Sequence, residues 1–280
     1  MSNPTLKRIA AASKYLVVLA GLAVITIWWI NTPAGVQGKL DAIGYAVCHQ
    51  IGERSFHIGP IQLPLCARCS GMYLGAMAGL LLLALLRPRY AKMPRWQVIV
   101  PLAVFVLAFG IDGANSYLYL IKQVYPGALA QIPNIYVPNN TLRLLTGSGM
   151  GLVIAAALYP AFNQTVWKET VEKPAMELKT LGILFAIQVV LDLLVLTDSP
   201  IVLFPLAIIS TLGVLVLLVM VYGMFWIMLV REDNQFTRLR QLWLPAVAGL
   251  TLAMVQIAGI DALRFWLTHT WGSIPLGLGG

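Results

Sequence analysis

Seven long runs of apolar residues constrain this sequence more than any other feature. They occupy residues 15–31, 70–87, 97–113, 142–162, 180–197, 201–230 and 242–263. About 20 consecutive apolar residues suffice for an α-helix to cross the hydrocarbon core of a bilayer. Every backbone polar group in that core needs an internal partner, which a helix provides for itself. The sequence therefore predicts an all-α polytopic transmembrane helix bundle of about seven spans.

The composition agrees with a surface that faces lipid. Hydrophobic residues make up 59% of the chain and charged residues only 11%, whereas roughly a quarter of a soluble domain is charged. We therefore expect a single membrane domain over 1–280, in contact with the lipid bilayer as a multi-pass protein of the cell (cytoplasmic) membrane. The net charge of +8 does not indicate a nucleic-acid partner, because the lysines and arginines flank the apolar runs.

These flanking charges also predict the orientation of the chain. If the N-terminus lies inside, 13 of the 19 lysines and arginines fall on the inner side. The six on the outer side are Lys39, Arg54, Arg68, Lys122, Arg143 and Arg264. Basic residues favour the cytoplasmic side of a membrane. We therefore expect the N-terminus inside, the C-terminus outside, and the connections 32–69 and 114–141 outside.

All three cysteines fall within the external segment 32–69. Three thiols cannot all pair with one another. The Cys66-Ala67-Arg68-Cys69 motif brings two sulfurs onto one turn, and Cys48 with its neighbouring histidine adds the ligand types that suit zinc or a similar divalent metal. We therefore predict that the three sulfurs converge and form an external metal-binding site, our favoured function. The candidate ligands are Cys48, His49, His57, Cys66 and Cys69.

Three other interpretations of these cysteines stay open. The charge of Arg68 and a helix N-terminus near Cys69 would lower a thiol pKa, as a membrane thiol-disulfide oxidoreductase requires. A disulfide that staples the segment would instead leave one inert buried thiol. A non-catalytic subunit of a larger membrane complex would need a membrane-protein partner and no chemistry at the cysteines.

Polar residues within and beside the apolar runs form a second signal. Intramembrane charges are costly, so they usually face the bundle interior, pair with one another and mark a functional cavity. We predict such a cavity beneath the external Cys/His segment, where it would bind or transport a small solute or ion. Arg143 is expected to pair with a carboxylate, Asp112 being the first choice. The predicted cavity residues are Arg54, Arg68, Asp112, Asn115, Asn140, Arg143, Thr146, Asp192 and Asp261.

Small residues at four-residue spacing occur in two of the predicted spans. They are Gly71 and Gly75 in the second span and Gly147 and Gly151 in the fourth. Glycines at this spacing let helix backbones approach closely in membranes. We expect both spans to use these faces for helix packing.

A set of short motifs extends over about residues 40–155. They are Cys48-His49-Gln50, Glu53-Arg54-Ser55-Phe56, Leu63-Pro64-Leu65-Cys66-Ala67-Arg68-Cys69 and Gly71-x-Tyr73-Leu74-Gly75, followed by Asp112 and Asn140-x-x-Arg143-x-x-Thr146-Gly147. In these motifs the sequence resembles a family of predicted prokaryotic membrane proteins of unknown function. The resemblance implies that these positions form one shared site, and it implies no particular activity.

Overall fold

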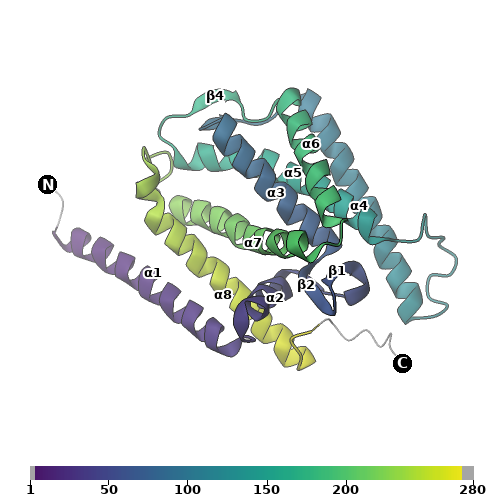
Figure 1. Cartoon of the computed structure of the whole chain (residues 1–280). Coiled ribbons are helices and arrows are strands. Elements are labelled where there is room, and N and C mark those ends of the chain that lie inside the picture. The colour runs from purple at the N-terminus through teal and green to yellow at the C-terminus, as the bar shows by residue number, and fades with distance from the viewer. Residues whose placement is uncertain (1–3, 273–280) are drawn as a thin grey trace.

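Eight α-helices make up most of the chain that the structure describes. The computed structural model describes the backbone of residues 4–272 and the side chains from residue 14 onward. The helices are α1 (Pro4–Asn31), α2 (Gly35–Val47), α3 (Ala67–Leu86), α4 (Trp96–Val124), α5 (Asn140–Val166), α6 (Leu178–Val195), α7 (Pro200–Leu229) and α8 (Trp243–Thr268) (Figure 1). All except α2 are long and apolar enough to cross a membrane, which confirms the predicted all-α bundle of seven spans.

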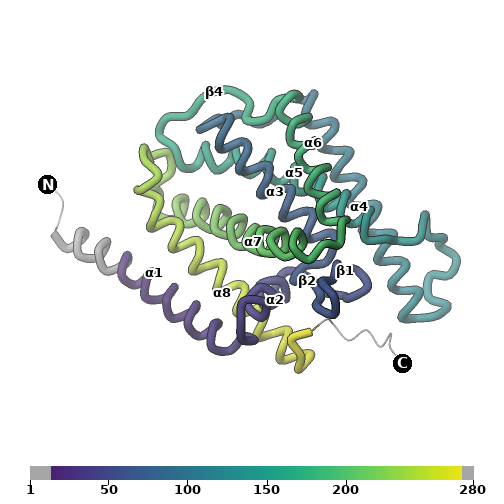
Figure 2. The backbone as a smooth tube through the Cα atoms, in the orientation of Figure 1, coloured from purple at the N-terminus to yellow at the C-terminus, as the bar shows by residue number. Residues whose placement is uncertain are grey.

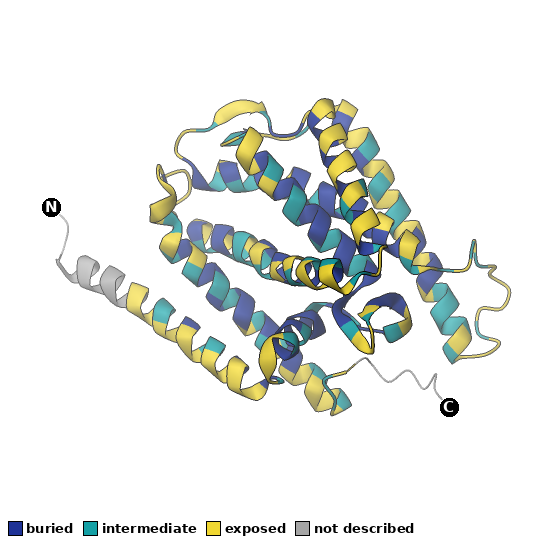
Figure 3. Cartoon of the chain, in the orientation of Figure 1, coloured by how far each residue is buried: buried dark blue, intermediate teal, exposed yellow. Residues whose placement is uncertain are grey.

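The outward faces of the long helices carry large apolar side chains. Figure 3 shows exposed residues along these faces and buried residues between the helices. The exposed side chains include Leu16, Leu85, Ile201 and Trp266. Apolar surface of this extent is rare on soluble monomers, whereas lipid tails match it. The chain is therefore a multi-pass membrane protein.

The centre of the bundle is the packing of α3 against α5. A Cβ atom added to Gly147 would lie 2.1 Å from the carbonyl oxygen of Arg68, and one added to Gly71 would lie 2.3 Å from that of Leu144. Only glycine allows backbones to approach so closely, which confirms the packing role predicted for these residues. The contact also fixes how the two helices are rotated relative to each other.

The segment 32–69 contains a β-hairpin that the sequence does not indicate. After α2 come the short 3-10 helix η1 (Gly52–Arg54) and an antiparallel hairpin of β1 (Ser55–Ile58) and β2 (Ile61–Cys66). α2 packs against β2 and α8. Tyr45 of α2 and Leu65 of β2 are each only 1% exposed, so apolar burial holds this segment in place. The cysteines thus belong to a folded cap at one end of the bundle.

The opposite end of α3 carries a second, smaller sheet. β3 (Tyr90–Lys92) follows α3 and pairs in parallel with β4 (Val171–Pro174), while the 3-10 helix η2 (Leu239–Leu242) precedes α8. Figure 2 shows α1 along one edge of the bundle, where it packs on α8. The cap with the cysteines and the β3–β4 pair therefore mark the two ends of the bundle.

α4 is longer than the sequence predicts. Its 29 residues continue to Val124, whereas the predicted span ends at residue 113. A helix of this length extends for about 43 Å, which exceeds the roughly 30 Å hydrocarbon thickness. Part of the connection expected at 114–141 is therefore helical, because the last turns of α4 have a mixed polar and apolar pattern that hydropathy does not score as a span.

Candidate metal centre

Cys48 is fixed at the end of α2 by an arginine of α8. α2 ends at Val47, and Cys48 follows in an extended conformation. The guanidinium of Arg264 donates hydrogen bonds to the carbonyl oxygens of Tyr45, Cys48 and His49, at 2.6, 2.6 and 3.1 Å. Carbonyl groups at a helix C-terminus have no partner within the helix. A single charged side chain therefore holds the backbone that carries Cys48.

β2 brings the other two cysteines to the start of α3. Cys66 is the last residue of β2 and the N-cap of α3, and Cys69 lies in the first helical turn. Cys66, as the N-cap residue, therefore lies at the positive end of the helix dipole. The partial positive charge there favours a thiolate over a thiol.

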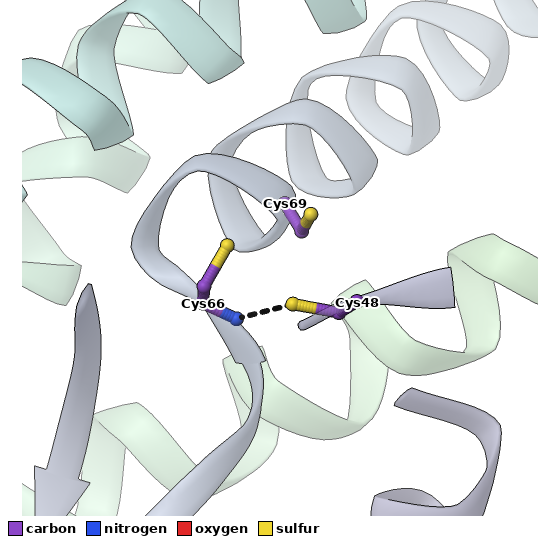
Figure 4. A group of neighbouring side chains, drawn as sticks. All are labelled: Cys48, Cys66 and Cys69. Carbon is purple, nitrogen blue, oxygen red and sulfur yellow. Dashed lines mark hydrogen bonds between the residues drawn. The ribbon is translucent and has the colours of Figure 1, made fainter. Parts of the chain in front are cut away.

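The three sulfur atoms converge, as the sequence predicts. The sulfurs of Cys48, Cys66 and Cys69 all lie within 4.8 Å of one another (Figure 4). Two sulfurs on one tetrahedral zinc ion are about 3.8 Å apart, because each zinc–sulfur bond is about 2.3 Å long. None of the three is in a disulfide in the described structure. A small inward shift of the side chains would thus bring all three sulfurs onto a common ion.

Backbone N–H groups are directed at the sulfur of Cys48. This sulfur accepts hydrogen bonds from the N–H groups of Cys66, at 3.2 Å, and Gln50, at 3.5 Å. Figure 4 shows the first of these bonds. Hydrogen bonds to the charged form of a group favour that form. The backbone here is therefore arranged to stabilise negative charge on Cys48.

Gln50 links α2, which precedes Cys48, to β2, which carries Cys66. Its side-chain amide donates to the carbonyl oxygens of Asp41, in α2, and Pro64, in β2, both at 2.9 Å. The residue is 5% exposed and has a φ of 51°, a left-handed conformation that a non-glycine residue adopts rarely. The glutamine of the Cys48-His49-Gln50 motif thus holds Cys48 next to Cys66.

The pKa values of Cys48 and Cys66 are shifted in opposite directions. The pKa of Cys66 lies well below its usual range, because its sulfur is hydrogen-bonded by Cys48, Cys69 and His49. The pKa of Cys48 is instead raised to about 12, first by its hydrogen bond with Cys66 and also by burial. A second thiolate beside the first therefore needs a compensating positive charge. A cation between the sulfurs supplies that charge.

The structure does not place either predicted histidine in this ligand group. The Nδ1 atom of His49 accepts a hydrogen bond from the N–H group of Ile51, at 3.0 Å. In a neutral ring the proton then lies on Nε2, so His49 acts as a hydrogen-bond donor toward Cys66. His57 is exposed on β1, where it pairs with Gln62 across the hairpin. Either histidine would have to move to bind the same ion as the three sulfurs.

A buried ion pair lies beside the cysteines and joins α3 to α4. Arg68, between Cys66 and Cys69 in the sequence, pairs with Asp112, whose side chain is 2% exposed. The hydroxyl groups of Tyr136, at 2.6 Å, and Thr146, at 3.3 Å, also donate to this carboxylate. Burial, together with the hydrogen bond to Asp112, raises the pKa of Tyr136 to about 12, so its hydroxyl keeps the proton that it donates.

The predicted direct pairing of Arg143 with Asp112 is wrong. Arg143 is 6% exposed, and its Nη1 atom donates to the Oδ1 atom of Asn140, at 2.9 Å. Asp112 pairs with Arg68 instead. Gly147 packs on the Arg68 backbone, and its neighbour Thr146 donates to Asp112, so this contact holds Arg68 next to the carboxylate.

The remaining predicted cavity residues take part in separate interactions. Asn115 holds the segment after α4, since its side chain bonds to Asn134, Ile135 and Tyr136. Asp192 accepts hydrogen bonds from Ser148, at 2.7 Å, and Gln188, at 2.9 Å. Asp261 accepts one from Trp28, at 2.8 Å, between α1 and α8. Arg54, Arg68, Asp112, Asn140, Arg143 and Thr146 are thus the predicted residues that interact beside the cysteines.

Two residues that support the site were not predicted. Arg264 contributes only to the predicted topology, and Tyr136 lies in a connection with no motif. Arg264 follows Asp261 by three residues in an otherwise apolar span. Charges inside an apolar span usually have a partner in the bundle, and this was the available signal.

Comparison with known proteins matches residues 48–157 to the family described as predicted membrane protein (DUF2085). An uncharacterized protein of Methanothermobacter thermautotrophicus is 30% identical over 110 residues, which are 39% of this chain and 82% of that protein. The chain belongs to the DUF2085 family. An uncharacterized protein of Methanocaldococcus jannaschii is 26% identical over 132 residues, which are 46% of this chain and 72% of that protein. No solved structure gives a significant match.

The DUF2085 match contains the whole cysteine group and the polar residues beside it. It begins at Cys48 and ends within α5, so it includes Asp112 and Arg143. α6, α7 and α8 follow the matched region. In this chain Arg264, which lies outside the matched region, holds the backbone at Cys48 in place.

We predict that Arg264→Gln exposes Cys48 to thiol reagents. Loss of hydrogen bonds from a charged donor weakens a contact by about 1.5–3 kcal/mol, so the rate of Cys48 labelling in chelator-treated protein should rise about 10- to 100-fold. Mass spectrometry of maleimide-labelled peptides measures this rate. Arg240→Gln, an exposed arginine just before α8, is the matched control. An unchanged labelling rate in Arg264→Gln would show that this arginine does not position Cys48.

Proposed function

We propose that this membrane protein binds a thiophilic metal ion through Cys48, Cys66 and Cys69. The observation that carries the proposal is the convergence of three sulfurs within 4.8 Å at the end of α3. Thiolate ligands select zinc, copper(I) and related soft ions over magnesium or calcium. The N–H bonds to Cys48 and the helix N-terminus at Cys66 further support thiolate ligands.

The ligand set leaves one coordination position for another group. Among the described residues, no histidine, aspartate or glutamate joins the three sulfurs. Structural zinc sites usually have four protein ligands, whereas sites that exchange a ligand keep one position open. A three-sulfur site therefore suits an ion that is exchanged or that binds a further small ligand. The charge bias of the flanking segments supports a location at the outer face of the membrane.

Thiol-disulfide exchange is the second candidate, and the position of Cys66 favours it. A cysteine at a helix N-cap with a lowered pKa is a typical nucleophile. Exchange also requires access for a second disulfide or thiol. Cys66 is 2% exposed and Cys48 is 6% exposed, so such access needs local opening, whereas a metal ion is small enough to fit between the sulfurs.

Metal content and thiol titration of the purified protein test the proposal together. We expect about one equivalent of zinc or copper per chain when no chelator is used, because the three sulfurs form one site. All three cysteines should react with a thiol reagent after denaturation in the presence of chelator. A metal-free protein with a single reactive thiol would instead indicate a disulfide and would contradict metal binding.

A further inference from the structure

Two arginines of different elements meet at Ser116 of α4. The Nη2 atom of Arg54, in η1, donates to the carbonyl oxygen of Ser116 at 2.9 Å. The Nη2 atom of Arg68, in α3, donates to the hydroxyl oxygen of the same serine at 3.2 Å. These bonds hold two guanidinium groups next to each other at the end of the bundle that carries the cysteines.

A third arginine is joined to Arg54 through Asn140. Arg143 donates to the Oδ1 atom of Asn140, and the Nδ2 atom of Asn140 donates to the carbonyl oxygens of Glu53, at 3.2 Å, and Ser55, at 3.3 Å. Glu53 and Ser55 are the neighbours of Arg54 in the chain. Three guanidinium groups therefore lie around one polar junction of η1, α3, α4 and α5.

The three arginines have fewer ion-pair partners than charges. Within the described chain, Asp112 is the one carboxylate that pairs with any of the three arginines, and it pairs with Arg68. Arg54 is 9% exposed and Arg143 is 6% exposed, and the Nε atom of Arg143 is buried without a hydrogen-bond partner. Burial, and then the charge of Arg68, lower the pKa of Arg54. Buried like charges of this kind are costly unless an anion offsets them.

We infer that Arg54, Arg68 and Arg143 bind the phosphate group of an anionic ligand beside the cysteines. The planar guanidinium group donates two parallel hydrogen bonds to phosphate oxygens, which makes arginine the preferred residue for such recognition. Arg143 also lies in the first turn of α5, where free N–H groups favour a negative charge. None of the three cysteines would bind the phosphate group, although the charge of Cys66 acts on Arg54.

The phosphate group has two sources, a free phosphate ion and the headgroup of a phospholipid. A cavity of about 250 Å³ lies between α4, α5 and α6, near the junction but not lined by the three arginines. Its lining is mostly apolar, with Phe105 and Phe185, and also includes Thr146, which donates to Asp112, and Asp192. An acyl chain fits this lining. Both sources would place a phosphate group at the three arginines. Only a phospholipid would also place an acyl chain in the cavity.

Thermal unfolding of the full-length protein in a nonionic detergent tests the inference for both sources. In one arm, inorganic phosphate is titrated against chloride at equal ionic strength. In the other, phosphatidylglycerol is titrated against phosphatidylcholine. We expect saturable stabilisation in at least one arm. A response to phosphate identifies a free anion, and a response confined to phosphatidylglycerol identifies a headgroup. Absence of both responses overturns the inference.

Substitution of Arg143 separates ligand binding from a structural role. Arg143→Gln should weaken the affinity for the stabilising anion about 10- to 100-fold, as expected for loss of a charged hydrogen-bond donor. Without added anion its melting temperature should equal or exceed that of the wild type, because one repelling charge is removed. Arg54→Gln should behave in the same way and serves if Arg143→Gln cannot be purified.

The control is Arg87→Gln, which removes a charge at the opposite end of α3 from an arginine paired with Glu177. It should retain the full response to anion. If the arginine variants at the junction kept the wild-type affinity, or if they lost stability equally with and without anion, the three arginines would be structural and the inference would be wrong.

Discussion

Cys66→Ser is expected to remove metal from the purified protein almost completely. Serine keeps the size of the side chain but replaces a soft thiolate with a hydroxyl group that zinc and copper(I) bind poorly. Loss even of a hydrogen-bond partner of a ligand weakens metal binding by about 10- to 100-fold, so loss of one of three ligands should weaken it more than 100-fold. Competition with a chromogenic chelator measures the affinity.

The two histidines provide graded controls for this prediction. His49→Gln removes a donor to Cys66 and should weaken binding by about 10- to 100-fold, the range for partners of metal ligands. His57→Gln changes an exposed residue of β1 outside the sulfur group and should leave the affinity unchanged. If His57→Gln lost metal as completely as Cys66→Ser, the three-sulfur arrangement would not be the binding site.

The seven spans could be predicted because hydropathy reports the property that decides them. A bilayer requires long apolar helices, and these runs are visible in the sequence without tertiary information. The end of α4 was not predicted, since the turns up to Val124 carry polar residues, among them Tyr117, Tyr119 and Lys122. Helix continues there although the apolar signal has ended.

The cysteine group was predictable from residue chemistry, whereas its hydrogen-bond partners were not. Cys48 and the Cys66–Cys69 pair lie on opposite sides of a hairpin, and pairing of β1 with β2 brings Ser55 next to Cys66. The role of Arg264 depends on how α8 packs against α2, which sequence spacing does not determine. Arg264 and Cys48 are 216 residues apart in the sequence. The Nη1 atom of Arg264 nevertheless lies 2.6 Å from the carbonyl oxygen of Cys48.

The choice between Arg68 and Arg143 as the partner of Asp112 depends on helix rotation. Both arginines lie in the first turns of their spans, so hydropathy places them equally well for pairing. Contact of Gly147 with the Arg68 backbone fixes the rotation of α5 against α3. The glycine motifs therefore predicted that these helices pack closely, but they did not predict which side chain reaches the carboxylate.

Asp112→Asn is expected to destabilise the protein more than any other single polar substitution at this junction. The carboxylate is 2% exposed and is the partner of Arg68 and the acceptor for Tyr136 and Thr146. Removal of one partner of a buried ion pair costs about 3–5 kcal/mol, because the other charge stays buried without compensation. Here that charge is part of a group of three arginines. Unfolding in mixed micelles by a denaturing detergent measures the change in free energy of unfolding.

An exposed pair and a double substitution make this prediction specific. Glu177→Gln breaks the Arg87–Glu177 pair, in which the glutamate side chain is 48% exposed, and should cost at most about 1 kcal/mol. Arg68→Gln combined with Asp112→Asn should be less destabilised than the sum of the two single variants, because neither charge is then left alone. Strictly additive losses would mean that Arg68 and Asp112 are not coupled, and the stability of this end of the bundle would have to come from apolar packing in the cap and from the glycine contacts between α3 and α5.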